Sequence, residues 1–191
     1  MKIGVLALQG AFIEHINVLQ NLGAETVELR QLKDIMQTLD GIVLPGGEST
    51  VQAKLLHELN MYQPLKQQII NGLPVLATCA GMILLAQHLS NDKSIHLATM
   101  PITVKRNAYG RQLGSFFTEA NFTDIGKVPM TFIRAPYIEK AEKNVQILSQ
   151  VNNHIVAAQY NKQIALAFHP ELDADKNTAV HEYFLNLCKY K

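Results

Sequence analysis

The sequence predicts an α/β fold: a three-layer, flavodoxin-like sheet that is mostly parallel and carries an antiparallel extension. Within residues 1–90, short apolar runs alternate with amphipathic runs of helical period, which is the pattern of a parallel sheet covered by helices on both faces. Beyond residue 100 the pattern changes to short strands joined by turn residues such as Asn152 and Asn153. The chain has 191 residues, of which 48% are hydrophobic, so we expect one globular domain spanning 1–191.

The expected elements follow from these periods. The first half should hold, in chain order, strand 3–8, helix 12–21, strands 26–29 and 41–44, one or two helices from 50 to 70, strand 74–78 and helix 81–89. The helix that begins at Thr50 should place Val51, Leu55 and Leu59 on one apolar side. The second half should hold strands 102–105, 115–119, 130–133, 145–151, 155–159 and 164–168, the last three as a meander, and a closing helix over 177–189. In such folds, ligands bind beyond the C-terminal ends of the parallel strands.

Cys79 lies in a tight turn, because it follows strand 74–78 and precedes helix 81–89. Ala80 and Gly81 are small enough to let the turn be sharp and to let a substrate come close. The N-terminus of a helix also favours negative charge beside it. This is the arrangement of a nucleophile elbow with Cys in place of Ser. The alternative for a single Cys after an apolar strand is a small buried hydrophobe.

The segment AFHPEL supplies the other groups that a Cys nucleophile needs, His169 and Glu171. A histidine takes and returns the proton, and a carboxylate holds the imidazole in the required tautomer. A His-Pro-Glu segment alone has low specificity. Its combination with Cys79 and with the glycine loop described next favours a catalytic site.

A glycine loop, LPGGEST at 44–50, joins the apolar strand 41–44 to the helix that follows it. The adjacent Gly46 and Gly47 expose backbone N–H groups, and such a loop can present one of them to a developing oxyanion. The alternatives are a plain turn or a phosphate-binding loop. No Lys follows the glycines, which disfavours a phosphate-binding loop of the Walker type.

Together, TCAGM, LPGGES and FHPEL resemble the class I (triad) glutamine amidotransferases. Further segments, LQGA with Glu14 and His15, RNAYGRQ at 106–112 and FIRAP at 132–136, resemble one branch, the glutaminase subunits of pyridoxal 5′-phosphate synthases. The likeness runs from residue 8 to residue 172. RNAYGRQ and FIRAP indicate the branch, whereas TCAG and HPE are shared across the superfamily.

The resemblance implies that the chain hydrolyses L-glutamine to L-glutamate and ammonia through a thioester on Cys79. His169 would be the base, Glu171 would orient it, and no metal or cofactor would be needed. The N–H groups of Gly47 and Ala80 would form the oxyanion hole. The resemblance assigns glutamine binding to Gly46, Gly47, Glu48, Ser49, Arg106, Ile133 and Arg134. Arg106 suits the substrate carboxylate and Glu48 suits its ammonium.

The resemblance also implies a partner, a PdxS-type pyridoxal 5′-phosphate synthase subunit that receives the ammonia within a large hetero-oligomer. Gln9 and Gly10, which follow the first strand, are expected to sense that partner, and His15 is expected to serve the contact. The other histidines are expected at the surface or at helix caps. Cys188 is expected to pack in the last helix.

Composition narrows the function classes. Seventeen Lys and Arg against sixteen Asp and Glu give a net charge of +1, so neither nucleic acid nor an anionic membrane surface is an expected partner. No apolar run is long enough for a signal peptide or a bilayer span. Two Cys do not make a disulfide framework, and a catalytic thiol suits the cytoplasm. The alternatives are a glutaminase of another pathway, a stand-alone Cys-elbow hydrolase or peptidase, and a non-catalytic binding module.

Overall fold

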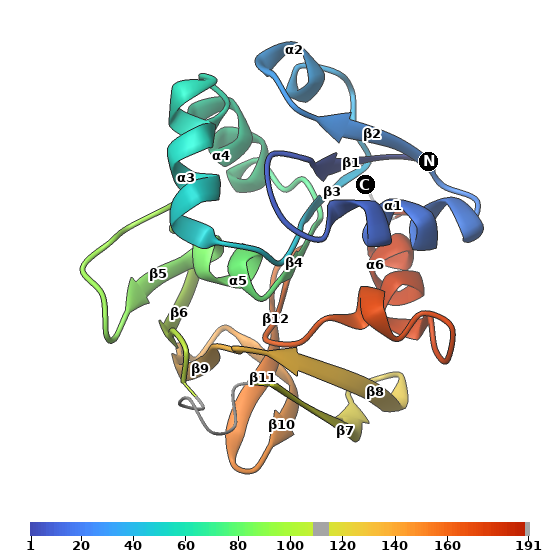
Figure 1. Ribbon diagram of the computed structural model, residues 1–191, viewed down its shortest axis with the longest axis vertical. Coiled ribbons are helices and arrows are strands. Elements are labelled where there is room, and N and C mark those ends of the chain that lie inside the picture. The colour runs from blue at the N-terminus through green and yellow to red at the C-terminus, as the bar shows by residue number, and fades with distance from the viewer. Residues whose placement is uncertain (109–114, 190–191) are drawn as a thin grey trace.

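The computed structural model describes residues 1–108 and 115–189, and its main feature is one large mixed sheet (Figure 1). In the described part of the chain this sheet has ten strands, in the order β2-β1-β3-β4-β12-β11-β9-β6-β5, with β10 paired to β11. The described residues also form a separate two-stranded ribbon, β7-β8. The expected α/β fold with a mostly parallel core and an antiparallel extension is confirmed.

The parallel part of the sheet comprises β1 (Lys2–Leu6), β2 (Glu25–Leu29), β3 (Gly41–Leu44), β4 (Val75–Thr78) and β12 (Gln163–Leu166). Their spatial order, β2-β1-β3-β4-β12, is the flavodoxin-like order, and each neighbouring pair is parallel. Every residue of β3, β4 and β12 is buried, as expected for strands covered on both faces. The carboxyl ends of these strands therefore meet along one edge.

The antiparallel part begins at β11 (His154–Tyr160), which pairs with β12 on one side and with β9 (Tyr137–Ala141) on the other. Beyond β9 lie β6 (Met100–Lys105) and β5 (Ala86–Leu89), while β10 (Gln146–Val151) pairs with β11. The ribbon consists of β7 (Ser115–Phe122) and β8 (Gly126–Ile133).

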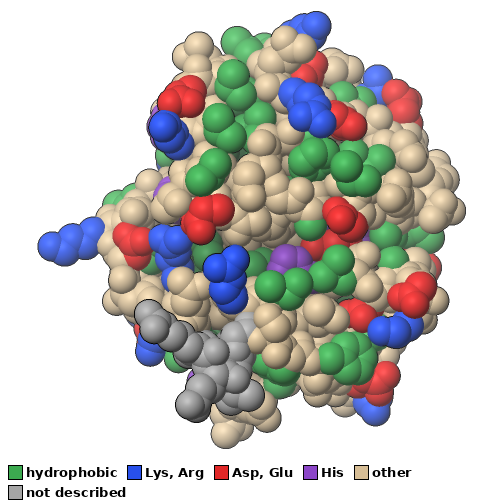
Figure 2. All heavy atoms as spheres, in the orientation of Figure 1, with side chains coloured by type: hydrophobic (Ala, Val, Ile, Leu, Met, Phe, Trp, Pro, Cys, Tyr) green, Lys and Arg blue, Asp and Glu red, His purple; other side chains and the backbone are tan. Residues whose placement is uncertain are grey.

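Helices cover both faces of the parallel part (Figure 1). On one side lie α1 (Phe12–Asn21) and α6 (Ala179–Lys189), and on the other lie α3 (Ser49–Glu58), α4 (Tyr62–Ile70) and α5 (Ala80–Leu85). A short helix, α2 (Leu32–Ile35), contacts β2, and a 3₁₀ turn, η1 (Pro170–Leu172), follows β12. Charged side chains of both signs are interspersed over the face shown in Figure 2.

Two expected features of the helices are wrong. The expected helix 81–89 ends at Leu85, because Ala86 turns to extended geometry and residues 86–89 pair with β6 instead. In α3, Val51 and Leu59 are exposed, and the buried face is formed by other residues, Ser49, Gln52, Ala53 and Leu56. The amide nitrogen of Gln52 donates to two backbone carbonyls, which helps a polar residue to take a position expected to be apolar.

Sequence reasoning missed two elements and misplaced a third. β9 was missed because four of its five residues are half-buried or exposed and only Ile138 is buried. α2 is only one turn long, closed by a capping box between Gln31 and Asp34. β12 was expected only as the last strand of a meander, yet it also lies against β4. No helix among residues 1–108 and 115–189 is long and apolar enough to cross a membrane.

Candidate active site

Four loops meet at the carboxyl edge of the parallel strands. They follow β1, β3, β4 and β12, and they carry Gln9, Gly46, Cys79 and His169. Here the chain surrounds a cavity of about 320 Å³. Its lining comprises Gln9, Gly10, Ala11, Gly46, Gly47, Glu48, Ser49, Cys79, Ile83, Arg106, Asn107, Ile133, Arg134, Pro136 and His169. The structure therefore brings residues that follow separate strands together at this edge, as the sequence predicts.

Cys79 occupies the expected strand-to-helix elbow, between β4 and α5. Its backbone has φ +47° and ψ −99°, a conformation that non-glycine residues rarely adopt and that costs on the order of 1–3 kcal/mol. The Cys79 N–H holds the turn by donating to the carbonyl of Leu166 in β12, at 2.8 Å. The helix that follows is shorter than expected. Only 8% of Cys79 is exposed, and its side chain borders the cavity.

His169 and Glu171 lie beside Cys79 because β12 is the neighbour of β4 in the sheet. His169 Nδ1 is 2.7 Å from Glu171 Oε1, and both His169 and Cys79 border the cavity. His169 and Glu171 are buried. The carboxylate thus lies behind the imidazole, and the imidazole and the thiol both lie at the cavity.

Two opposing effects set the pKa of His169. Burial lowers it, but the hydrogen bonds to Cys79 and Glu171 and the negative charge of those partners outweigh burial and raise the pKa to about 10. Burial raises the pKa of Glu171, but the positive charge that His15 carries when protonated, together with the hydrogen bond and the charge of His169, outweighs burial and lowers the pKa overall. At neutral pH the carboxylate is therefore ionised and favours a charged imidazolium, which can hold and return a proton beside Cys79.

The glycine loop is fixed against its neighbours. Gly46 N–H donates to Thr78 Oγ1 at 2.9 Å, and the Gly46 carbonyl accepts from Ala11 N–H at 3.0 Å. A side chain at Gly46 would collide with the His169 ring. Gly10, at φ +105°, brings its backbone against the Gly46 carbonyl so closely that a Cβ there would also collide. Glycine is therefore required at Gly46 by the nearby His169 ring and at Gly10 by the nearby Gly46 carbonyl.

Gln9 ties the loop after β1 to the glycine loop. Its side-chain carbonyl accepts from Glu48 N–H at 2.7 Å, and its backbone carbonyl accepts from Gln52 Nε2 at 2.9 Å. Gln52 Nε2 also lies 3.2 Å from the carbonyl of Pro45. Gln52 was missed from the sequence, and its signal is a polar residue on the buried face of α3.

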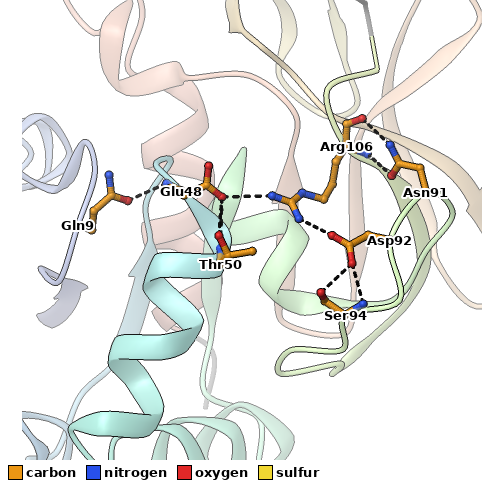
Figure 3. Close-up of polar contacts among 7 residues, drawn as sticks. All are labelled: Gln9, Glu48, Thr50, Asn91, Asp92, Ser94 and Arg106. Atoms are coloured by element: carbon orange, nitrogen blue, oxygen red, sulfur yellow. Dashed lines mark hydrogen bonds and ion pairs between the residues drawn. The ribbon is translucent and has the colours of Figure 1, made fainter.

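Arg106 and Glu48, expected to bind the two ends of free glutamine, are paired with each other (Figure 3). Arg106 Nη2 is 3.2 Å from Glu48 Oε1, and Nη1 is 2.6 Å from Asp92 Oδ2. The hydrogen bonds from Ser94, assisted by Arg106, lower the pKa of Asp92 to about 2 despite the opposing effect of burial. Sequence reasoning missed Asp92, which lies in the irregular segment before β6.

The remaining predicted residues surround the thiol. The Ile133 carbonyl is 4.0 Å from Cys79 Sγ, and Arg134, with φ +43°, lines the cavity beside it. Ser49 is buried, and its hydroxyl has no hydrogen-bond partner among the described residues. Ala80 begins α5 and is also buried. The last four residues of RNAYGRQ, 109–112, lie outside the described residues.

The sequence pattern of the SNO glutamine amidotransferase family matches residues 5–190. The chain belongs to this family. A relative from Desulfitobacterium hafniense, "Pyridoxal 5'-phosphate synthase subunit PdxT", is 61% identical over 186 residues, which are 97% of this chain and 92% of the relative. A relative of the same name from Streptococcus pneumoniae is 55% identical over 194 residues, covering both chains fully.

Solved structures agree with this placement in the glutamine amidotransferase family. The crystal structure of a glutamine amidotransferase superposes with a TM-score of 0.92 at 35% identity and covers 98% of each chain. A putative GMP synthase subunit from Thermoplasma acidophilum superposes with a TM-score of 0.66 at 17% identity, covering 99% of this chain and 94% of that one. The second likeness shows the shared fold alone.

Histidines of this glutamine amidotransferase differ from expectation. His15 was expected to serve a partner contact, and the other non-catalytic histidines were expected at the surface or at caps. Instead His15, His96 and His181 are buried. His15 Nε2 lies 3.3 Å from Glu171 Oε2, and His15 Nδ1 lies 3.0 Å from His181 Nε2. Among the described residues, no group of three or more His, Cys, Asp or Glu side chains is arranged to hold a metal ion.

Burial of His181 predicts how stability of the glutamine amidotransferase depends on pH. Burial lowers the pKa of His181 to about 3, and the charge of His15 adds to the shift. Below about pH 6.5 the unfolded chain binds a proton that the folded chain rejects, so the free energy of unfolding falls as pH drops. In His181→Gln that decline should be shallower, by up to about 1.4 kcal/mol per pH unit.

Urea unfolding at pH 7.0, 6.0 and 5.0 measures this difference. His88→Gln, at an exposed histidine of β5, is the matched control and should keep the wild-type slope. Parallel curves for wild type and His181→Gln would show that His181 is not held neutral in the folded chain.

Proposed function

We propose that this chain hydrolyses L-glutamine to L-glutamate and ammonia and delivers the ammonia to a PdxS-type synthase subunit that makes pyridoxal 5′-phosphate. One observation carries the chemistry: Cys79 and His169 border the same cavity as the glycine loop, and Glu171 pairs with His169 from behind. Membership of the SNO glutamine amidotransferase family supports the substrate. Identities of 55% and 61% to PdxT subunits support the pathway.

The chemistry begins with the proton on His169, where the Glu171 carboxylate favours it, and with the Cys79 sulfur as the thiolate. The sulfur then attacks the carboxamide carbon of glutamine, and the C=O electron pair moves onto oxygen. As this oxyanion collapses, the C–N bond breaks, and His169 gives its proton to the departing ammonia. Water next attacks the thioester while His169 takes one of its protons. Collapse of the second oxyanion breaks the C–S bond, glutamate leaves, and the sulfur returns to the thiolate beside the protonated His169. Glu171 holds His169 in one orientation throughout.

The oxyanion is stabilised by the N–H groups of Gly47 and Ala80. Each such donor is typically worth about a hundredfold or more in rate. Ala80 follows the nucleophile at the start of a helix, where backbone N–H groups lack intrahelical partners. Gly47 borders the cavity. Its peptide orientation depends on the Gly46 carbonyl, which the loop after β1 holds through Ala11.

The ends of glutamine bind where Arg106 and Glu48 now pair. The substrate carboxylate takes the place of Glu48 on the guanidinium, and the substrate ammonium takes the place of Arg106 on Glu48. Each of the two side chains keeps one partner of opposite charge, and Asp92 keeps the guanidinium in place from its other side. Gly46, Ser49, Ile133 and Arg134 complete the pocket around the substrate.

Ammonia is protonated in water at neutral pH, so a productive glutaminase needs a partner that receives it directly. Gln9 and Gly10 are placed to sense such a partner, since they lie on the loop that contacts the Gly46 carbonyl and the Glu48 N–H. A synthase subunit docked on this loop shifts the Gly46–Gly47 peptide to the orientation that completes the oxyanion hole. The assembly is a large hetero-oligomer.

Ammonia release from glutamine should therefore be slow in the isolated chain and rise on addition of the synthase. Gln9→Ala removes the acceptor for Glu48 N–H, so it should lower the stimulated rate more than the basal rate. Gln87→Ala, at an exposed position of β5, is the control and should keep both rates. Equal, full turnover with and without the synthase would favour a stand-alone hydrolase.

A further inference from the structure

Glu171 has two carboxylate oxygens, and the contact with His169 uses only one of them. Oε1 lies 2.7 Å from His169 Nδ1. Oε2 is buried without a well-aligned hydrogen-bond partner among the described residues, and the nitrogen that faces it is His15 Nε2, at 3.3 Å. A buried carboxylate oxygen without a donor is costly. Hydrogen bonds of catalytic groups are often long in a free enzyme and tighten in the reacting complex.

We infer that His15 of α1 is a positioning residue for the triad: its Nε2–H donates to Glu171 Oε2 and, with His169, fixes the carboxylate from both sides. His15 does not touch the reacting atoms in this account. It acts through Glu171, which orients His169. The inference rests on the proposed glutaminase function. It adds His15 to the triad as a fourth side chain and His181, behind His15, as a fifth.

His181 of α6 sets the tautomer that this role requires. His15 Nδ1 lies 3.0 Å from His181 Nε2, so one of the two nitrogens carries the proton between them. If His181 Nε2–H donates, His15 Nδ1 accepts, and the His15 proton is left on Nε2, facing the carboxylate. Both rings are fully buried, and burial lowers the pKa of each, which keeps them neutral at pH 7. In the proposed arrangement the chain of donors runs in one direction, from His181 through His15 to Glu171.

The same nitrogen of His15 also reaches the glycine loop. Nε2 is 3.3 Å from Thr78 Oγ1, and that oxygen accepts the N–H of Gly46 at 2.9 Å. Thr78 precedes Cys79 directly in the chain. One buried side chain from α1 thus contacts both the acid of the triad and the residue that holds the glycine loop. The Gln9–Gly10 loop leads directly into α1, and His15 lies in the first turn of that helix. His15 therefore links the loop proposed to sense the partner to the acid of the triad.

Loss of the Nε2–H donor has a specific consequence. The groups that face Glu171 are His169 and His15, and those that face His15 are Glu171, His169, His181 and Glu14. Without the donor, the carboxylate keeps one partner in a buried site, so it binds a proton at a higher pH than before. Glutaminase activity then fails at a higher pH on the acid side. A purely structural role for His15 would change the amount of folded enzyme and not this pH.

Two substitutions at His15 separate the donor from the ring. In His15→Gln the amide nitrogen takes nearly the place of Nε2, so a donor still faces Glu171. In His15→Asn the amide nitrogen takes the place of Nδ1, so that donor is lost. With saturating synthase, we expect His15→Asn to lower kcat by about tenfold to a hundredfold with KM nearly unchanged. It should also move the acid limb of the pH profile upward, whereas His15→Gln should restore most of kcat and the wild-type limb.

The inference is overturned if His15→Asn and His15→Gln share the wild-type kcat and acid limb, or if both lose activity equally with an unchanged limb. A second measurement uses the wild-type chain and does not depend on the variants folding. In the ¹⁵N spectrum of histidine-labelled protein at pH 7, His15 should carry its proton on Nε2 and have an unprotonated Nδ1. The opposite tautomer would refute the role. If the wild type with synthase releases no ammonia, the proposed function fails, and the tautomer still decides the positioning of Glu171.

Discussion

Replacing Cys79 by alanine should reduce glutamine hydrolysis to the background rate, a loss of roughly a thousandfold or more, while the fold persists. Alanine removes the nucleophile and leaves the backbone of the elbow, which Leu166 of β12 holds through the Cys79 N–H. Cys79→Ser should be similarly inactive. Ammonia release with saturating synthase measures the loss, and circular dichroism measures the fold.

Cys188→Ala is the matched control. Burial raises the pKa of Cys188 to about 12, and its side chain lies in α6, away from the cavity lining. A glutamine analogue that alkylates thiols should therefore label Cys79 before Cys188. Turnover retained by the Cys79→Ala variant would end the covalent mechanism.

His169→Asn should be about as damaging as loss of Cys79, and Glu171→Gln clearly less so. Triad members act as a unit, and the orienting acid usually contributes about a hundredfold less than the nucleophile or the base. In this chain, Gln at position 171 can still accept from His169 Nδ1 through an amide oxygen, so part of the orientation survives. The His169→Asn variant keeps no group that can transfer the Cys79 proton.

Single-turnover kinetics separate the two variants. Rapid quench and mass spectrometry measure the formation of the thioester. It should be undetectable in His169→Asn and slow in Glu171→Gln. His154→Asn, at a histidine of β11 that stacks on Tyr137, is the control for loss of an imidazole elsewhere. If Glu171→Gln proved the slower variant, the roles given to His169 and Glu171 would be wrong.

The centre of the parallel half could be predicted because β3 and β4 are short runs of mostly apolar residues. Every residue of β3 and β4 is buried, so hydrophobicity alone marks them. The place of β12 could not be predicted in this way. Its sequence pattern fits a hairpin partner of β11, and β12 does pair with β11. Its other edge pairs with β4, and this second pairing brings His169 beside Cys79.

The meeting of Gln9, the Gly46–Gly47 loop and Cys79 could be predicted because each follows a parallel strand. The polar residues behind them could not, because their partners are far apart in sequence. His15 and His181 are 166 positions apart, and His15 and Thr78 are 63 apart. A local signal does exist: His15 and His181 lie on the buried faces of α1 and α6, where an unpaired polar group is costly. A histidine at an apolar position of an amphipathic helix therefore indicates a buried partner.

The central claim is that ammonia from the Cys79 site reaches the synthase without mixing with the solvent. The most direct test supplies the reconstituted pair with glutamine labelled with ¹⁵N in its side-chain amide, in the presence of a large excess of unlabelled ammonium. Mass spectrometry then measures ¹⁵N in the pyridoxal 5′-phosphate formed. The account predicts that most of the product carries the label and that Cys79→Ala abolishes labelling. Product labelled only to the level of the bulk ammonium pool would contradict delivery from this chain.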